Sequence, residues 1–420
     1  MKILLISCRF PSDLQTDVQG TFRRFNLFLD AFKAIAQLDV LFYVPDGVDW
    51  GADAIATHQR TLSKHWNTPI NLFLCPQRSG SQSAPKWQRQ LKPIVDFRAQ
   101  GHFFSTSGAQ QVDALETCLE RQPDAIFCHR LEAMTPILQT QRPVPPLLFD
   151  LDDVEHISFA RQIGQPPTRL LTKLYYLQIP ALCWGERRSI QRARRTFVCS
   201  HPDRQYLSQR WQHKGVVTVP NAVPMSTAQP LCQKPTVMFL GGYYYFPNLN
   251  AANFLIEQVW PHIHKARPDA RLIIAGTHPE AIRRYHSQPP GVEFTGFVEN
   301  LDTLYGRTRA VCCPILSGGG TRVKIIEAAA YGKPIVATPI GAEGLSMADD
   351  KEILIRRSAQ EMAQACLELL SNDSLCQRLG SAARQKAAQQ YDRTQVIQMI
   401  QTHVRRALDQ DLAVPALVTP

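Results

Sequence analysis

Short apolar runs, rich in β-branched and aromatic residues, recur along the chain, and each is followed by a longer segment of helical character. In the first half these runs lie at 2–7, 38–44, 70–75, 124–128, 147–151, 196–200 and 216–220. A second series lies at 236–242, 271–276, 292–296, 310–314, 334–338 and 352–355. Strands that alternate with helices in this way predict parallel sheets, apolar on both faces because helices cover both.

The two series are separated by a stretch without periodicity, "NAVPMSTAQPLCQKP" at 221–235, which is typical of a linker. A chain of 420 residues also exceeds the size at which one core stops growing, roughly 250–300 residues. We therefore predict an α/β fold of two doubly wound, Rossmann-like parallel-sheet domains that face a central cleft. The domains are expected at 1–220 and 236–384, followed by a helix at 385–408 and a loose tail at 409–420.

Composition places the protein among globular chains, with 44% hydrophobic and 20% charged residues. Its eleven cysteines form no CxxC pair or zinc spacing, so we interpret them as reduced core thiols of a reducing compartment. The opening "MKILLISC" is typical of a strand and lacks the apolar length of a signal peptide. These features predict a cytoplasmic protein.

The formal net charge of +10 is concentrated in one segment. Residues 161–214 hold eleven Lys or Arg against Glu186 and Asp203, a net charge of +9. Outside this segment the numbers of positive and negative residues are nearly equal, so the composition disfavours a protein that binds nucleic acid. The basic segment, in which aromatics are mixed with cations, could contact an anionic membrane peripherally at its inner face, or it could be a solvated helix face whose arginines pair across domains.

The stretch "SGGGTRVKIIEAAAYGKPIVAT", 317–338, directly follows a predicted strand. Gly318, Gly319 and Gly320 would let a ligand approach the backbone, and Thr321 is expected to cap the next helix. We expect that helix at about 322–331, ended by the glycine and proline that follow.

The start of this helix is predicted to bind an anion. Its free N–H groups and positive dipole end favour negative charge, and Arg322 and Lys324 add two cations. Lys324 and Glu327 share one stripe of the helix, so Glu327 could accept both hydroxyls of a ribose. The alternative is a glycine loop followed by a solvated Lys–Glu pair, worth ~0.2–0.5 kcal/mol.

These residues resemble those of the retaining glycosyltransferases of family 4, also called group 1 glycosyltransferases, which have the GT-B fold. The resemblance rests on "GGGTRVKIIEAAAYGKPIVAT", "FLGGYYYFPNLNAANFLIEQVWPHI", "FTGFVENLDTLYGRTRAVCCPILSGGGTR" and "PIGAEGL". It covers the second domain almost continuously. Over the first domain it is confined to the strand-one loop, "PDAIFCHR", "LFDLDDVEH" and "VPNAV".

The resemblance implies a nucleotide-diphosphate sugar as the donor substrate and a saccharide or lipid-linked molecule as the acceptor. Glu327 would hold the donor ribose, with Arg322 and Lys324 near its diphosphate. The loop at Gly241 and Gly242 would face the same phosphates.

Two residues of the first domain are also implicated by the resemblance. Gly20 matches a glycine-bearing turn that approaches the donor from the opposite side, and His129 matches a histidine near the transferred sugar. A structural hydrogen bond is the alternative role for His129. The helix at 385–408 would cross back to pack on the first domain.

The reaction implied is transfer with retention of anomeric configuration, with neither a metal nor a conventional general base. Positive groups would stabilise the departing diphosphate, which would itself take the acceptor proton. The run "LFDLDDVEH" holds Asp150, Asp152 and Asp153, which could form a divalent-metal site. A structural or acceptor-side role is favoured because a basic phosphate pocket is predicted elsewhere.

The chain departs from the family pattern at two positions. Gly319 replaces the first of the family's two motif glutamates, and "GYYYFPNLN" replaces the usual arginine and lysine after the first strand of the second domain. Arg322 could take over the leaving-group role. A nucleotide-sugar epimerase of the same fold and an inactive sugar-nucleotide-binding subunit remain alternatives, whereas a dehydrogenase is disfavoured because neither domain opens with GxGxxG.

Overall fold

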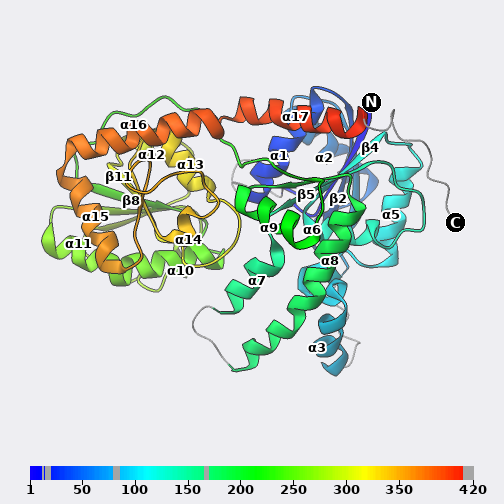
Figure 1. Cartoon of the computed structure of the whole chain (residues 1–420), viewed down its shortest axis with the longest axis horizontal. Helices are drawn as coiled ribbons and strands as arrows, with labels where there is room; N and C mark the ends of the chain where they lie inside the picture. The colour runs from blue at the N-terminus through cyan, green and yellow to red at the C-terminus, as the bar shows by residue number, and fades with distance from the viewer. Residues whose placement is uncertain (12–13, 15–19, 79–85, 165–169, 410–420) are drawn as a thin grey trace. The chain divides into compact units, whose positions relative to one another are not determined.

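The computed structural model describes residues 1–11, 14, 20–78, 86–164 and 170–409, and the expected tail at 409–420 lies outside this part except for its first residue. The chain forms two compact units, shown in Figure 1. Unit 1 comprises Met1–Val219 with Ile397–Pro420, and unit 2 comprises Pro220–Val396. Among the described residues, no helix has the length and apolar character needed to cross a membrane.

Unit 1 is built on a seven-stranded sheet in which every strand pair is parallel, in the order β3-β2-β1-β4-β5-β6-β7. The strands are β1 (Lys2–Ser7), β2 (Gln37–Val44), β3 (Ile70–Pro76), β4 (Ala125–His129), β5 (Leu147–Asp152), β6 (Arg195–Val198) and β7 (Val216–Thr218).

Helices lie on both sides of this sheet (Figure 1). They are α1 (Gly20–Lys33), α2 (Ala52–His65), α3 (Lys86–Val95), η1 (Phe97–Ala99), α4 (Gly101–Phe104), α5 (Ala109–Leu119), α6 (Arg130–Ile137), α7 (Glu155–Ile163), η2 (Leu170–Gln178), α8 (Ile179–Arg192) and α9 (His201–Trp211). The α1 helix is anchored by aromatic packing, because the ring of Phe28 lies 4.7 Å from that of Phe127 and 5.1 Å from that of Phe197.

Unit 2 is built on a six-stranded parallel sheet in the order β10-β9-β8-β11-β12-β13. Its strands are β8 (Thr236–Leu240), β9 (Arg271–Ala275), β10 (Val292–Gly296), β11 (Ala310–Cys313), β12 (Ile335–Ala337) and β13 (Leu354–Ile355). Its helices are α10 (Phe246–Phe254), η3 (Leu255–Val259), α11 (Trp260–Ala266), η4 (Pro279–Ala281), α12 (Leu301–Gly306), α13 (Val323–Ala330), α14 (Pro339–Ala342), α15 (Ala359–Ser371) and α16 (Asp373–Gln390), and α17 (Arg393–Asp409) leads back into unit 1.

The predicted fold class, two doubly wound parallel sheets, is confirmed, and each predicted strand is present to within a few residues. Two boundaries in the structure differ from the expected ones. Residues 221–235 belong to unit 2, where Val223 forms a parallel bridge with Asp392. The helix expected at 385–408 is interrupted after Gln390 and resumes as α17, because the backbone N–H of Arg393 donates to Val223 instead.

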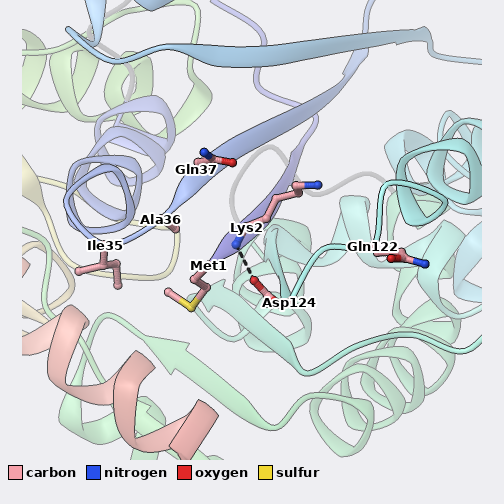
Figure 2. A pocket seen from close by; sticks show the side chains of 7 residues that line it. All are labelled: Met1, Lys2, Ile35, Ala36, Gln37, Gln122 and Asp124. Atoms are coloured by element: carbon pink, nitrogen blue, oxygen red, sulfur yellow. Dashed lines mark hydrogen bonds between the residues drawn. The ribbon is translucent and has the colours of Figure 1, made fainter.

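In each sheet, successive strands are first added on one side of the first strand and then on the other, and this change of side marks the point where the strand order reverses. In unit 1 the reversal lies between β1 and β4, and in unit 2 between β8 and β11. Ligands of open α/β sheets bind outside the carboxyl ends of the strands at such points. A surface hollow of about 510 Å³ (Figure 2), where the backbone N–H of Lys2 donates to Asp124, instead lies at the amino ends of β1, β2 and β4.

Candidate functional site

Glycine backbone follows both central strands of unit 2. Gly241 and Gly242 come directly after β8, and Gly318–Gly320 follow β11. Gly318 has φ +102° and Gly320 has φ +67°, values that side chains disfavour. The two loops therefore leave the carboxyl edge of the sheet lined by main chain rather than by side chains.

The side chain of Arg322 folds back onto the glycine loop. Its Nη1 donates to the carbonyls of Gly319 and Gly320, and its Nη2 donates to the carbonyl of Ser317 at 3.4 Å. Arg322 is the residue before α13, and its positive charge is close enough to lower the pKa of Lys324 in the first turn of that helix. In this structure the guanidinium thus fixes the shape of the loop.

Lys324 points toward the other loop of the same edge. Its Nζ donates to Asn248 Oδ1 at 2.7 Å, and Asn248 Nδ2 donates to the carbonyl of Gly242 at 3.0 Å. The ammonium also lies 4.5 Å from the ring centre of Phe239. A Cβ on Gly241 would lie 2.9 Å from Asn248 Cγ and 3.0 Å from this ammonium, so a side chain there would displace both groups.

The environment of Lys324 disfavours its charged form. Burial lowers its pKa to about 8, the nearby charge of Arg322 acts in the same direction, and Cys313 and Glu327 oppose the shift. A cation destabilised in this way, next to helix N–H groups, gains most from a bound anion.

Glu327 lies one turn further along α13, and its side chain is buried. Its Oε2 accepts a hydrogen bond from the hydroxyl of Tyr305 at 3.5 Å, and the Tyr305 ring stacks on Tyr331 at 4.1 Å. A hollow of about 420 Å³ lies next to Tyr331, with residues 299–302 forming its remaining wall. Glu327 is therefore linked through Tyr305 to the aromatic pair that borders this hollow, and its expected bond to a ribose stays a prediction.

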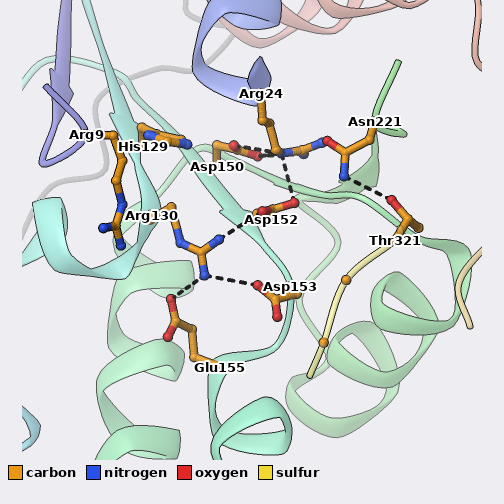
Figure 3. Close-up of polar contacts among 12 residues, drawn as sticks. Arg9, Arg24, His129, Arg130, Asp150, Asp152, Asp153, Glu155, Asn221 and Thr321 are labelled. Carbon is orange, nitrogen blue, oxygen red and sulfur yellow. Dashed lines mark hydrogen bonds and ion pairs between the residues drawn. The ribbon is translucent and has the colours of Figure 1, made fainter. Parts of the chain in front are cut away.

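The prediction that Thr321 caps the helix is wrong. The helix begins at Val323, and its N-cap residue is Arg322, which makes no capping side-chain bond. The hydroxyl of Thr321 instead accepts from Asn221 Nδ2 at 2.9 Å (Figure 3). This bond fixes the end of the glycine loop to the first residues of unit 2.

Three aromatic side chains are exposed between β8 and the first residue of α10, where the resemblance led us to expect an arginine and a lysine. They are Tyr244, Tyr245 and Phe246, which start just beyond Gly242. A side chain on Gly318 would lie 3.6 Å from the hydroxyl of Tyr245. The aromatic loop therefore borders the glycine loop.

In unit 1, His129 ends β4 at the reversal point and is buried. Its Nδ1 pairs with Ser7 Oγ at 2.9 Å, a bond to the end of β1. Burial lowers the pKa of His129 well below its usual range, and the charges of Arg130, Arg9 and Arg24 add to this effect. The imidazole is therefore neutral at physiological pH. The buried bond to Ser7 fits the structural role, and the positioning role stays a prediction.

Gly20 is the first residue of α1 and is exposed. Its expected place beside the donor stays a prediction.

The acidic run at the end of β5 is paired with arginines (Figure 3). Asp150 and Arg24 form a fully buried bidentate ion pair at 2.7–3.0 Å. Arg130 contacts Asp152 at 2.9 Å and both Asp153 and Glu155 at 3.1 Å. Within the described ranges, no group of three or more His, Cys, Asp and Glu side chains is arranged to hold a metal ion. These pairs favour the structural role over the metal role.

Several of these residues were not identified from the sequence. Asn248 and Tyr305 contact Lys324 and Glu327, and Arg24 and Arg130 neutralise the acidic run. Asn248 lies only six residues after Gly242, so its proximity to a strand-end loop was a usable signal. Arg130 directly follows His129 at the end of β4, which was a similar signal. Tyr305 and Arg24 are distant in sequence from their partners, and no local pattern marks them.

Part of the chain is similar to known proteins in sequence. Residues 234–372 match the family model described as "Glycosyl transferases group 1". A phosphatidyl-myo-inositol mannosyltransferase of Mycobacterium leprae is 28% identical over 206 residues, which are 44% of this chain and 53% of that protein. An uncharacterized 44.6 kDa protein in the cps region of Klebsiella pneumoniae is 24% identical over 172 residues, 39% of this chain and 44% of that one. The chain spans about half the length of the curated relatives it matches.

Solved structures resemble the whole chain in fold. Sucrose-phosphate synthase of Thermosynechococcus elongatus aligns with a TM-score of 0.71 at 14% identity, covering 97% of this chain and 99% of that one. HepE of Anabaena, determined with UDP and glucose, aligns with a TM-score of 0.62 at 15% identity, covering 96% and 99%. TarM of S. aureus aligns with a TM-score of 0.67 at 11% identity, covering 97% and 99%. The predicted GT-B fold is confirmed.

Proposed function

We propose that the protein is a glycosyltransferase that moves a sugar from a nucleotide-diphosphate sugar to a saccharide or lipid-linked acceptor, with retention of anomeric configuration. One observation carries the proposal: Lys324, Glu327 and two main-chain glycine loops converge at the reversal point of the unit 2 sheet. The family match of residues 234–372 covers these groups and supports the same activity.

The donor diphosphate would bind between the two glycine loops. Lys324 and the free N–H groups of Val323 and Lys324 would face its phosphates, and Arg322 would hold the loop and contribute its positive field. As the sugar–phosphate bond breaks, negative charge grows on the departing diphosphate, and these fixed groups stabilise it. HepE has been crystallised with UDP-glucose, which supports a donor of this class.

The ribose would be held by Glu327, which lies one turn beyond Lys324 on the same side of α13. An ionised carboxylate can accept hydrogen bonds from two hydroxyls. Gly241, Gly242 and Gly318–Gly320 would allow the phosphates to reach the main chain. The proposed donor site is thus formed by the loops that follow the two central strands, β8 and β11.

The acceptor side is assigned to unit 1. His129 is neutral and well anchored by Ser7, so it would orient a hydroxyl group and would not act as a cation. We assign proton uptake from the acceptor to the leaving phosphate, with no metal. Undiminished transfer in the presence of EDTA is the expected result, and loss of transfer would return the acidic run to consideration as a metal site.

A second candidate is a sugar-nucleotide-binding subunit without catalysis. Gly319, standing where the family's first motif glutamate is expected, favours it, because that glutamate usually contacts sugar hydroxyls. A nucleotide-sugar epimerase of the same fold is the remaining alternative.

Product analysis separates the three activities. The full chain would be incubated with radiolabelled nucleotide sugars, with and without saccharide acceptors, and the anomeric configuration of products read by NMR. Acceptor-dependent transfer with retention is expected. A changed sugar on the nucleotide without an acceptor would indicate an epimerase. Neither transfer nor hydrolysis with any donor that binds would indicate a binding subunit.

We also propose that the protein acts in the cytoplasm, with peripheral contact at the inner membrane face.

A further inference from the structure

The glycine loop Gly318–Gly320 is flanked by buried polar atoms that lack a hydrogen-bond partner among the described residues. The side chain of Ser317 is 1% exposed, and its Oγ has no partner there. The Nε of Arg322, whose two Nη nitrogens bond the carbonyls of the loop, is also buried without one. Buried polar atoms are rarely left unsatisfied, so two of them beside one loop indicate that a ligand completes the hydrogen bonding here.

The main chain of this loop offers donors as well. Within the part of the chain that the structure describes, the N–H groups of Gly318, Gly319 and Gly320 donate to no other residue. Gly318 and Gly320 have left-handed φ values, and Gly319 between them does not. Alternation of this kind is found in backbone nests, whose N–H groups bind the oxygen atoms of ligands.

Tyr245 brings a side-chain hydroxyl to the same loop. A Cβ on Gly318 would lie 3.6 Å from Tyr245 Oη and 3.5 Å from Arg322 Nη2. The side chain of Tyr245 is 52% exposed, so a ligand can reach it. A phenolic hydroxyl both donates and accepts, so it can bind a ligand oxygen while it keeps a partner within the protein.

The order of groups along α13 indicates which part of a donor would reach this loop. Glu327 is the residue assigned to the ribose, and Lys324 and the helix start are assigned to the diphosphate. Val323 and Lys324 precede Glu327 by four and three residues, roughly 4.5–6 Å along a helix. The glycine loop comes next toward the N-terminus. Because a nucleotide sugar carries its sugar on the far side of the diphosphate from the ribose, the sugar would lie against the glycine loop.

We propose that Tyr245 Oη, together with Ser317 Oγ and the N–H groups of the glycine loop, binds the hydroxyl groups of the transferred sugar. This inference rests on the proposed function, because the place of the sugar follows from that of the diphosphate. It adds two sugar-binding side chains, one on each of the loops that follow β8 and β11.

The chemistry of these groups favours a sugar over a phosphate as their ligand. Phosphates bind best to cations and to helix N–H groups, and Lys324 and the start of α13 supply both. The hydroxyl groups of Tyr245 and Ser317 are neutral and can each donate and accept. A sugar hydroxyl has the same two capacities, so the pairs match.

The proposal is tested by calorimetric titration of the full chain, without an acceptor, with three pairs of ligands: UDP and UDP-glucose, GDP and GDP-mannose, and ADP and ADP-glucose. The pair whose diphosphate binds most tightly is then titrated into Tyr245→Phe, which loses one oxygen from an exposed ring. Affinity for the nucleotide sugar should fall about threefold to tenfold, as expected for one neutral hydrogen bond. Affinity for the nucleoside diphosphate should not change.

Tyr244→Phe is the matched control. The side chain of Tyr244 is 54% exposed, and its ring packs against His278 in the loop after β9. Loss of its hydroxyl should leave both affinities as they are in the unmodified protein. Equal losses of nucleotide-sugar affinity in Tyr244→Phe and Tyr245→Phe would overturn the specific role of Tyr245.

Ser317→Ala separates sugar binding from a structural role. Removal of a buried hydroxyl without a partner should leave the midpoint of thermal unfolding unchanged or raise it, whereas affinity for the nucleotide sugar should fall about threefold to tenfold. A lower midpoint would show that the hydroxyl is satisfied within the free protein, and would remove Ser317 from the proposed site.

The outcomes separate this inference from the proposed function. Binding of none of the six ligands would remove the proposed function and this inference with it. A diphosphate that binds, and that Tyr245→Phe weakens as much as the nucleotide sugar, would leave the donor site in place and refute the sugar contact alone. Unchanged affinity for both ligands in Tyr245→Phe would refute it too.

Discussion

The pKa of Lys324 is expected to differ between the free protein and the protein with a bound diphosphate. Its pKa of about 8 in the free protein lies below the usual 10.5 because burial destabilises the ammonium. Between these two values the unfolded chain binds more protons, so this group makes the free protein more stable as pH rises. A bound diphosphate reverses the preference, because its negative charge stabilises the ammonium.

We therefore predict that diphosphate affinity falls as pH rises above about 8, since binding must then include uptake of a proton. Calorimetric titration across this range, in buffers of different ionisation enthalpy, would measure both the affinity and the proton uptake. In Lys324→Arg the fall should be much smaller, because arginine stays charged throughout. An affinity in the unmodified protein that does not change with pH would contradict the assignment.

The buried pair of Arg24 and Asp150 is expected to matter for stability rather than for chemistry. Arg24→Met should destabilise unit 1 by ~3–5 kcal/mol, because it leaves a carboxylate buried and unpaired. Arg24→Met/Asp150→Leu should recover much of this loss. The control Arg307→Met breaks an exposed pair with Glu293 and should cost ~1 kcal/mol or less. Urea unfolding would compare them, and similar costs for Arg24 and Arg307 would refute the prediction.

At the scale of elements, the loops after β8 and β9 pack backbone against backbone, at Gly241 and Gly276. Gly276 has φ +128°, and a side chain there would lie 1.9 Å from the carbonyl oxygen of Gly241. Gly276→Ala should therefore displace Gly241 and weaken both stability and diphosphate binding. Gly296→Ala meets no atom within 4 Å and should cost only the left-handed strain, ~1–2 kcal/mol. Thermal unfolding and nucleotide titration of both variants test this, and equal behaviour would show that the contact is unimportant.

At this scale the sequence predicted the strands well, because each is a short apolar run bounded by turn residues. The place of Lys324, Glu327 and the glycine loops at a strand end followed from the same pattern. The partner of Thr321 could not be predicted, because Asn221 is a hundred residues away and the choice between capping and that bond depends on tertiary structure. The bonds from Arg322 to the loop carbonyls could not be predicted either, because the hydrophobic pattern does not show which way those carbonyls point.

For the whole molecule, the path of the chain makes unit 2 a candidate for independent folding. The chain enters this unit near Val223 and leaves it near Asp392, and the two points are bridged. We predict that a fragment spanning 220–396 unfolds cooperatively and binds nucleoside diphosphate. Circular dichroism on heating and calorimetry would test both properties. A fragment that is unfolded at room temperature would show that unit 2 requires the rest of the chain.

The central claim, that a nucleoside diphosphate binds in unit 2 between the glycine loops and α13, is tested most directly by calorimetric titration of the full chain. The panel would contain UDP, GDP and ADP, each measured against the unmodified protein, Glu327→Gln and Lys324→Met. We predict binding of at least one nucleotide at one site, weakened roughly tenfold or more in each variant through loss of a charge-assisted bond. Binding of none of the three, or equal affinity in all three proteins, would contradict the account.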